Sequence, residues 1–367
     1  MTPQPMGAQL RPTFAQVGAA PAPASQGFHQ PNFPPPPYQP YAGPYATQPR
    51  WQPTAPRKTP IAVITALGAA GVVLILLLVS AITQPSDIRQ NPPATRYQNE
   101  SWELPPITSS PPELPMPKTE AEARTWLTGN KIYDITLASP VRCELELLPA
   151  GSVNDDALEK YLQKYIGCLT RVWGPALEQA GYIAYQPQIT VFPAGDSIQT
   201  PCGTINSQNA FYCSSDQRIY ISQDVADALT TDTQQSRVLF NLVIAHEYGH
   251  AMQGRTGILA AEHGITAMEE DNALELSRRF EVQADCFAGN AMNSLSEGLG
   301  ITDQDRQDIL QISYEIGDDQ LMKRSGQTPE PGGHGTGDNR RMWVKRGLGA
   351  SSLGICNAYA APSSEVK

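Results

Sequence analysis

Acidic residues are absent from residues 1–60 of this chain, and histidine is scarce throughout, with five in 367 residues. Four of the 26 Lys and Arg lie in residues 1–60, which leaves 22 against all 36 Asp and Glu in the rest, a net charge of −14 there. Phosphate binding needs a basic surface, so this balance argues against a nucleic-acid partner. It also gives no support to peripheral binding on an anionic lipid surface.

The same segment, 1–60, holds 16 of the 34 prolines. Such a segment cannot bury enough apolar surface to offset its chain entropy, so we expect a disordered tail. The run Pro34-Pro35-Pro36-Pro37-Tyr38 favours polyproline II geometry and is a possible docking peptide for a cytoplasmic partner. A solvated tail without a partner is the simpler interpretation.

Residues 61–82 contain no charge and are rich in Val, Leu, Ile, Ala and Gly. As a helix they would span roughly 33 Å, about the thickness of the hydrocarbon core of a bilayer. The run is long for a signal peptide and begins far from the start of the chain, so we expect one transmembrane helix. Arg50, Arg57 and Lys58 precede it, which predicts a cytoplasmic N-terminus and residues 83–367 outside the cell membrane. Nine prolines then mark a linker over 83–118, before a globular domain over 119–360 and a C-terminal tail over 361–367.

All six cysteines follow the expected membrane span, on the side where thiols can be oxidised. No C-x-x-C pair occurs, which disfavours a zinc site made of cysteines. Six cysteines allow fifteen pairings, and we expect disulfides, with Cys286 as a free buried thiol as the alternative. The expected pairs are Cys202–Cys213, Cys143–Cys168 and Cys286–Cys356.

Within the globular domain, hydrophobic periodicity and capping residues predict helices and strands together. Thr119 is a plausible N-cap of a short helix, and the segments 155–180, 237–253 and 272–295 read as longer helices. Residues 132–137, 182–192 and 218–222 read as strands from their β-branched and aromatic content. By analogy with zinc endopeptidases, the segment 218–221 could be an edge strand that binds the substrate backbone.

The segment His246-Glu247-Tyr248-Gly249-His250 is an H-E-x-x-H motif inside one of these helices. Four residues make about one helical turn, so both imidazoles project from the same face and can bind one Zn²⁺. Glu247 is then placed to hold and deprotonate a water molecule. The preceding residues 238–245 are almost wholly apolar, as a buried helix requires. A pair of ordinary helix histidines is the competing interpretation.

A catalytic zinc usually takes three protein ligands, so a third must come from elsewhere. Gln253 and Thr256 occupy the positions where a longer motif would carry Gly and a third His, which excludes that variety. Glu281 is the strongest candidate, because Asp285 follows one turn later and could accept an N–H from a ligand imidazole. Ala284 and Ala288 would let this helix pack closely on the first. The weaker candidates are His263, Glu269, Glu270 and Glu275.

Three segments together resemble the bacterial neutral zinc metallopeptidase family: the motif at 246–250, the run 281–289 with sequence EVQADCFAG, and the run 334–340 with sequence HGTGDNR. The resemblance covers roughly residues 120–360 and implies a zincin-like fold with His246, His250 and Glu281 as zinc ligands. The E-x-x-x-D element is also similar to membrane metallopeptidases of the Ste24/HtpX type. In that group a later His and an Arg six residues on, here His334 and Arg340, serve the transition state and the organisation of the site.

The glycine-rich surroundings of His334 suggest a flexible loop able to approach a metal site. Its imidazole could donate to the oxyanion of a tetrahedral intermediate, and Arg340 could bind a carboxylate.

The sequence therefore predicts an α+β, zincin-like metallopeptidase domain behind a single membrane helix, with Zn²⁺ as cofactor and peptides or proteins as substrates. The alternative is an inactive zincin-fold binding or scaffold protein of the cell envelope. Hydrolysis of a non-peptide amide is a third possibility.

Overall fold

The computed structural model describes residues 97–330 and 332–367. The expected tail over 1–60, the transmembrane helix over 61–82 and the linker as far as residue 96 lie outside the described residues. Among the helices that are described, none combines the length and hydropathy needed to cross a membrane.

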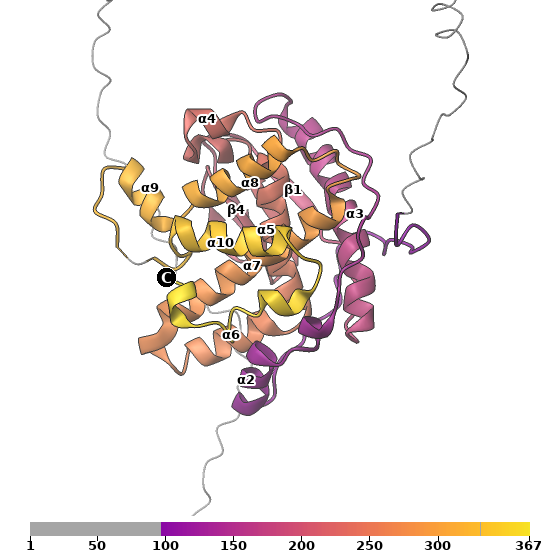
Figure 1. Cartoon of the computed structure of the whole chain (residues 1–367), viewed down its shortest axis with the longest axis vertical. Helices are drawn as coiled ribbons and strands as arrows, with labels where there is room; N and C mark the ends of the chain where they lie inside the picture. Colours follow the sequence, from indigo (N-terminus) through magenta and orange to yellow (C-terminus); the bar gives the residue numbers. More distant parts are fainter. Residues whose placement is uncertain (1–96, 331) are drawn as a thin grey trace, which may run out of the picture. The chain divides into compact units, whose positions relative to one another are not determined.

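The described part of the chain is a mixed helical and sheet structure (Figure 1). Its α-helices are α2 (Glu120–Thr128), α3 (Asp155–Gln179), α4 (Thr231–Gln234), α5 (Leu239–Arg255), α6 (Ile258–Thr266), α7 (Ala273–Leu295), α8 (Asp303–Glu315), α9 (Asp318–Arg324) and α10 (Gly337–Leu348). Its strands are β1 (Ile189–Phe192), β2 (Ile198–Thr200), β3 (Gly203–Ile205), β4 (Ala210–Cys213) and β5 (Arg218–Ser222). Short 3-10 helices cover Lys131–Asp134, Val225–Ala228, Glu270–Asn272, Leu353–Cys356 and Ser363–Glu365.

The larger sheet has the order β1-β5-β4, with β1 parallel and β4 antiparallel to β5. β5 therefore lies in the centre with both edges paired, and the expectation that residues 218–221 form an edge strand is wrong. Both of its neighbours contribute backbone hydrogen bonds, which leaves no free edge on β5 for a substrate. β2 and β3 pair separately as a small antiparallel hairpin.

Helix α5 lies in the middle of the domain, between α3, the sheet and α7 (Figure 1). All but one of its residues are buried, as its apolar first half predicts. Gly249 makes the contact with α7 possible, because a Cβ there would lie only 3.0 Å from Cα and the carbonyl oxygen of Ala284. The expected close packing of the two helices through small residues is thus confirmed at Ala284.

Helix α10 packs equally closely on α7, around Cys286 and Gly289. A Cβ on Gly289 would lie 2.4 Å from the Val344 carbonyl oxygen, and one on Gly347 would lie 2.1 Å from that of Cys286. Neither glycine can be replaced without moving a backbone. This contact fixes α10, and with it Arg340, relative to α7.

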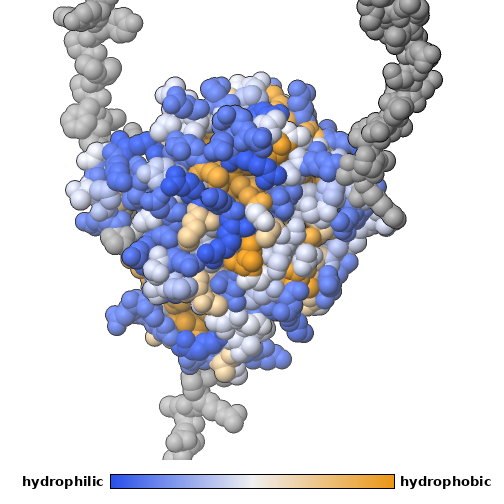
Figure 2. Space-filling view, viewed as in Figure 1, coloured by the Kyte–Doolittle hydropathy of each residue, from blue (hydrophilic) through white to orange (hydrophobic). Residues whose placement is uncertain are grey.

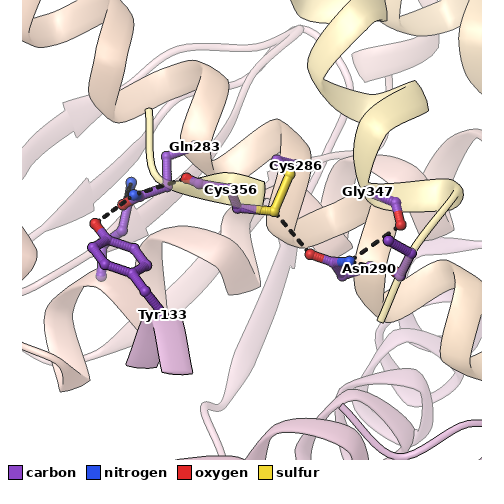
Figure 3. Close-up of a disulfide and its surroundings, with 8 residues drawn as sticks. Tyr133, Gln283, Cys286, Asn290, Gly347 and Cys356 are labelled. Carbon is purple, nitrogen blue, oxygen red and sulfur yellow. Dashed lines mark hydrogen bonds between the residues drawn. A yellow bond between two sulfur atoms is a disulfide. The ribbon is translucent and has the colours of Figure 1, made fainter. Parts of the chain in front are cut away.

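All three expected disulfides are present: Cys143–Cys168, Cys202–Cys213 and Cys286–Cys356. The last joins α7 to the segment that follows α10 and is shown in Figure 3. The alternative of a free thiol at Cys286 is therefore wrong.

Residues 97–118 pack against the domain, although this range belongs to the expected linker. Arg171 donates hydrogen bonds to three backbone carbonyls in residues 99–102. Arg255, which is 1% exposed, donates to the carbonyls of Pro112 and Glu113. Two arginines thus hold a proline-rich strap that has little regular structure of its own.

The C-terminal residues also belong to the domain rather than to a separate tail. Val366 is fully buried, and the Trp343 indole donates to the Glu365 carbonyl at 2.7 Å. The backbone N–H of Thr336 donates to the Lys367 carbonyl at 2.8 Å. The end of the chain therefore supports the start of α10.

Two of the predicted strands differ from the structure. Residues 131–134 form a 3-10 helix because the Asn130 side chain accepts from the N–H of Ile132 and starts a turn. Of residues 182–192, only Ile189–Phe192 pairs as a strand. The face seen in Figure 2 is mostly hydrophilic, with smaller apolar areas.

Candidate active site

Helix α5 presents the two histidines of the motif side by side. His246 and His250 lie one turn apart and are 9% and 8% exposed. Their Nε2 atoms are 3.1 Å from each other, so one metal ion could contact both nitrogens. Glu247, between them in sequence, is 7% exposed. The spacing of the motif thus gives the geometry expected from one helical turn.

Glu281 of α7 completes a group of three side chains that could hold a metal ion, called the metal-binding group below. Its Oε2 lies 3.3 Å from Nε2 of His246 and 3.6 Å from Nε2 of His250. Within residues 97–330 and 332–367, these three side chains are the one set with ligand atoms close enough to hold an ion together. The sequence candidate Glu281 is therefore brought to the histidines.

The three atoms fit zinc. Zinc binds imidazole nitrogen and carboxylate oxygen at roughly 2.0–2.2 Å in a tetrahedron, which places ligand atoms about 3.3 Å apart. The observed separations of 3.1, 3.3 and 3.6 Å bracket that value. Oε2 of Glu281 is also buried without a hydrogen bond among the described residues, a costly arrangement unless a cation binds there. Two neutral nitrogens and one carboxylate match a catalytic zinc site that keeps a position for water.

The charges around Glu281 favour its ionised form. Burial alone would raise the pKa of this carboxyl, but the charges of His250 and His334 and the contacts with the imidazoles hold it well below its usual value. Glu281 is therefore a carboxylate at neutral pH, as a metal ligand must be.

The second nitrogen of His246 faces a buried ion pair. Its Nδ1 lies 2.8 Å from Oδ1 of Asp285, and Arg340 of α10 donates two hydrogen bonds of 2.9 Å to the same carboxylate. The side chains of Arg340 and Asp285 are only 5% and 3% exposed. Burial opposes a charged imidazole, but the Asp285 and Glu281 carboxylates outweigh it and raise the pKa of His246 to about 10. Burial would raise the pKa of Asp285, yet Arg340 and His246 keep it below its usual value.

The second nitrogen of His250 faces an amide instead. Its Nδ1 lies 2.7 Å from Oε1 of Gln253, and the ring stacks on Phe280 with centroids 4.7 Å apart. In the sequence, Gln253 was notable only for standing where the longer zinc motif carries Gly, and its contact with His250 was not predicted. Its position three residues after His250, on the same face of the helix, was the available signal.

His334 lies in a loop that the structure anchors through Asp318. The His334 N–H donates to Oδ2 of Asp318 at 2.9 Å, and Nδ1 lies 3.1 Å from Oδ1. The imidazole remains 56% exposed. The charge of Glu281 and the contact with Asp318 raise the pKa of His334, although burial opposes them. Arg340, expected to bind a carboxylate or organise the site, binds Asp285.

The other candidate ligands do not join the group. His263 is 62% exposed on α6, with its ring 3.6 Å from the Glu262 carboxylate. Glu269 pairs with Arg124, and Glu275 pairs with Arg279. Glu270 begins the 3-10 helix before α7.

Comparisons with known proteins agree with this geometry. The family model described as "Putative neutral zinc metallopeptidase" matches residues 138–359. The protein YpfJ of Escherichia coli (strain K12) is 31% identical over 220 residues, which cover 57% of this chain and 74% of that protein. Rv2575 of Mycobacterium tuberculosis (strain H37Rv) is 32% identical over 205 residues, 52% of this chain and 67% of that protein. Both relatives carry the description "uncharacterized".

No solved structure matches the chain. The match to the family model covers more than half of the chain and includes the whole of the group formed by His246, His250 and Glu281. The chain belongs to the neutral zinc metallopeptidase family.

Proposed function

We propose that this protein is a membrane-anchored, zinc-dependent peptidase with His246, His250 and Glu281 as metal ligands and Glu247 as general base. The observation that carries the proposal is the convergence of three ligand atoms, from His246, His250 and Glu281, at separations of 3.1–3.6 Å. Glu247 follows His246 directly on the same buried helix, and metal binding does not require its carboxylate. A zinc ion held there would acidify a water molecule and polarise a substrate carbonyl.

The residues of the chain would then move the protons. Glu247 accepts a proton from the attacking water as the new C–O bond forms at the peptide carbonyl carbon. It passes that proton to the amine nitrogen as the C–N bond breaks. Two products result, one with a new carboxylate and one with a new amine.

His334 would assist at the oxyanion. The nearby Glu281 and the contact with Asp318 raise the pKa of His334 and favour the protonated ring, which can donate to a developing negative charge. Arg340 acts through Asp285 rather than on the substrate, because both of its bonds to a carboxylate go to that residue.

The membrane anchor over 61–82, the cytoplasmic N-terminus and a docking role for the proline-rich tail are part of this proposal and rest on the sequence alone. Three disulfides in the described domain support its placement outside the cytoplasm.

A catalytically inactive binding or scaffold protein is the second candidate. Its support is the long tail and anchor, which peptide hydrolysis does not require. Glu247 argues against it, since metal binding alone needs no general base.

The test uses the full chain, purified in mild detergent. The zinc content of the wild type and of Glu281→Ala is measured first, and one zinc per chain that falls sharply in the variant is expected. Glu247→Gln should keep its zinc and lose peptide hydrolysis by about 10²- to 10⁴-fold in a peptide-library assay. A Glu247→Gln protein that hydrolyses peptides at the wild-type rate would refute the mechanism. A zinc-loaded wild type that cleaves no peptide would favour the scaffold protein.

A further inference from the structure

We propose that Gln253 and Gln283 are positioning residues that fix the tautomer and the ring orientation of His250. The proposal rests on the proposed function, in which His250 binds zinc through Nε2. It concerns a chain of hydrogen bonds that runs from this imidazole into the disulfide-linked C-terminal segment. Gln253 and Gln283 are both completely buried, so water does not compete for their amide groups.

The first link has a defined direction. The amide nitrogen of Gln253 lies 2.7 Å from the backbone carbonyl oxygen of Phe280, which can only accept. The nitrogen of this amide must therefore point to Phe280, and its oxygen must point to Nδ1 of His250 at 2.7 Å. Since an amide oxygen only accepts, Nδ1 of His250 must carry the hydrogen. The lone pair of the neutral ring is then on Nε2, where the metal-binding group lies.

A second link gives the same direction. The amide nitrogen of Gln253 also donates to Oε1 of Gln283 at 3.1 Å. The amide nitrogen of Gln283 lies 3.1 Å from the Cys356 carbonyl oxygen and 2.9 Å from the Tyr133 hydroxyl (Figure 3). The Cys356 carbonyl can only accept, so the oxygen of Gln283 must face Gln253.

Rotation of either amide by half a turn would bring two oxygens together. In Gln253 the side-chain oxygen would face the Phe280 carbonyl at 2.7 Å, and the amide nitrogen would face a hydrogen on His250. Each buried group that loses its partner costs about 1–3 kcal/mol. The network therefore has one good arrangement, and it selects one tautomer of His250.

The two zinc ligands on α5 are thus held by different means. A buried ion pair, Asp285 with Arg340, faces His246, whereas an uncharged amide pair faces His250. The amide pair contacts His250 through uncharged groups. This chain of hydrogen bonds ends at the Cys356 carbonyl. The Cys286–Cys356 disulfide links that residue to α7, the helix that carries Glu281.

The test compares the full chain with Gln253→Met, Gln283→Met and the control Gln223→Met. The control removes a glutamine whose amide donates to the Val153 carbonyl at 2.8 Å and which contacts none of the ligands. Zinc affinity is measured by competition with a chelating dye. The tautomer of His250 is measured on zinc-free protein by long-range ¹H–¹⁵N NMR, with His250 identified by substitution among the five histidines.

We expect zinc affinity to fall about 10- to 100-fold in Gln253→Met and less in Gln283→Met, and to stay within about twofold of wild type in Gln223→Met. In zinc-free Gln253→Met the hydrogen on His250 should shift from Nδ1 toward Nε2. If Gln253→Met does not fold, Gln253→Asn replaces it, because its amide is one methylene too short to span the same gap.

A Gln253 variant that keeps both wild-type zinc affinity and the Nδ1–H tautomer overturns the proposal. Equal losses in Gln253→Met and Gln223→Met would do the same, since they would reflect a general loss of stability. The tautomer measurement needs neither zinc nor hydrolysis. Failure of the proposed function would instead appear as wild-type protein that binds no zinc or cleaves no peptide.

Discussion

The buried pair between Asp285 and Arg340 allows its roles in stability and in zinc binding to be separated. Asp285→Leu removes the carboxylate that faces Nδ1 of His246 and leaves the guanidinium of Arg340 buried. Among the described residues, that guanidinium then keeps one hydrogen bond, to the Ile316 carbonyl at 3.2 Å. Removal of one partner of a buried ion pair costs about 3–5 kcal/mol because the other charge is left unpaired. That is a large part of a stability that is typically about 5–15 kcal/mol.

Zinc affinity should fall for a different reason. Without Asp285, no carboxylate lies beside Nδ1 of His246, and loss of such a partner typically weakens metal binding about 10- to 100-fold. The double variant Asp285→Leu/Arg340→Met removes the unpaired charge as well. Replacement of a buried pair by apolar residues is often close to neutral, so we expect the double variant to regain most of its stability and to keep the weak zinc affinity.

The assay measures urea unfolding of zinc-free protein with its disulfides intact, so that bound metal does not add to stability. Zinc affinity is measured separately at fixed pH by competition with a chelator. A double variant that binds zinc as tightly as the wild type would refute the reasoning, because Asp285 would then serve only as the counter-ion of Arg340. A single variant as stable as the wild type would show that the pair is not effectively buried.

Four further predictions concern charge and covalent links. The carboxylates that raise the pKa of His246 to about 10 keep the zinc-free ring protonated at pH 7, so zinc binding should release a proton and tighten about tenfold per pH unit below pH 10, measured by titration at several pH values. This raised pKa also stabilises the zinc-free fold below the ordinary value of about 6.5, and urea unfolding should show that contribution lost as pH rises through about 10. The Cys286–Cys356 disulfide joins residues 70 apart, so its removal should lower the free energy of unfolding in urea by about 4 kcal/mol. An unchanged free energy would mean that the unfolded chain is as restricted without the disulfide as with it. Burial raises the pKa of Asp305, but hydrogen bonds from Arg237 and Thr302 lower it to about 2, so Asp305→Asn should cost about 1–2 kcal/mol above pH 4, and the difference from wild type should shrink as pH falls toward 2.

Long periodic segments of the sequence predicted the helices of the site well. The expected helices over 155–180 and 272–295 correspond to α3 and α7 within one residue at each end, and that over 237–253 to α5 within two. Several turns of periodic apolar residues leave little ambiguity about secondary structure.

The short apolar segments were predicted less well, because contacts with residues distant in sequence determine their structure. Residues 132–137 have the composition of a strand, but they pair with another segment only through one isolated bridge, between Thr136 and Ser352. Asn130 starts a 3-10 turn at the beginning of the segment instead. Residues 218–222 do form a strand, yet only the positions of β1 and β4 could show that it is central.

The extent of the domain was underestimated for the same reason. The carbonyls of 97–118 are held by Arg171 and Arg255, which lie far along the chain, and composition does not reveal such contacts.

The metal-binding group shows which kind of contact a sequence can predict. Glu281 and Asp285 could be proposed because they lie one turn apart on a single helix. Small residues on the same face, Ala284 and Ala288, indicated close packing there. The contact between Gly249 and Ala284 then brings α7 near enough to α5 for Glu281 to reach both imidazoles.

The role of Gln253 was not predicted, although it lies only three residues from His250. A side-chain amide can donate or accept, so its role is undetermined until its other partners are known. The Phe280 and Cys356 carbonyls, which determine the direction of the two amides, come from α7 and from the segment after α10. Charged partners of a metal site can therefore be proposed from spacing alone, whereas uncharged partners require the fold that orients them.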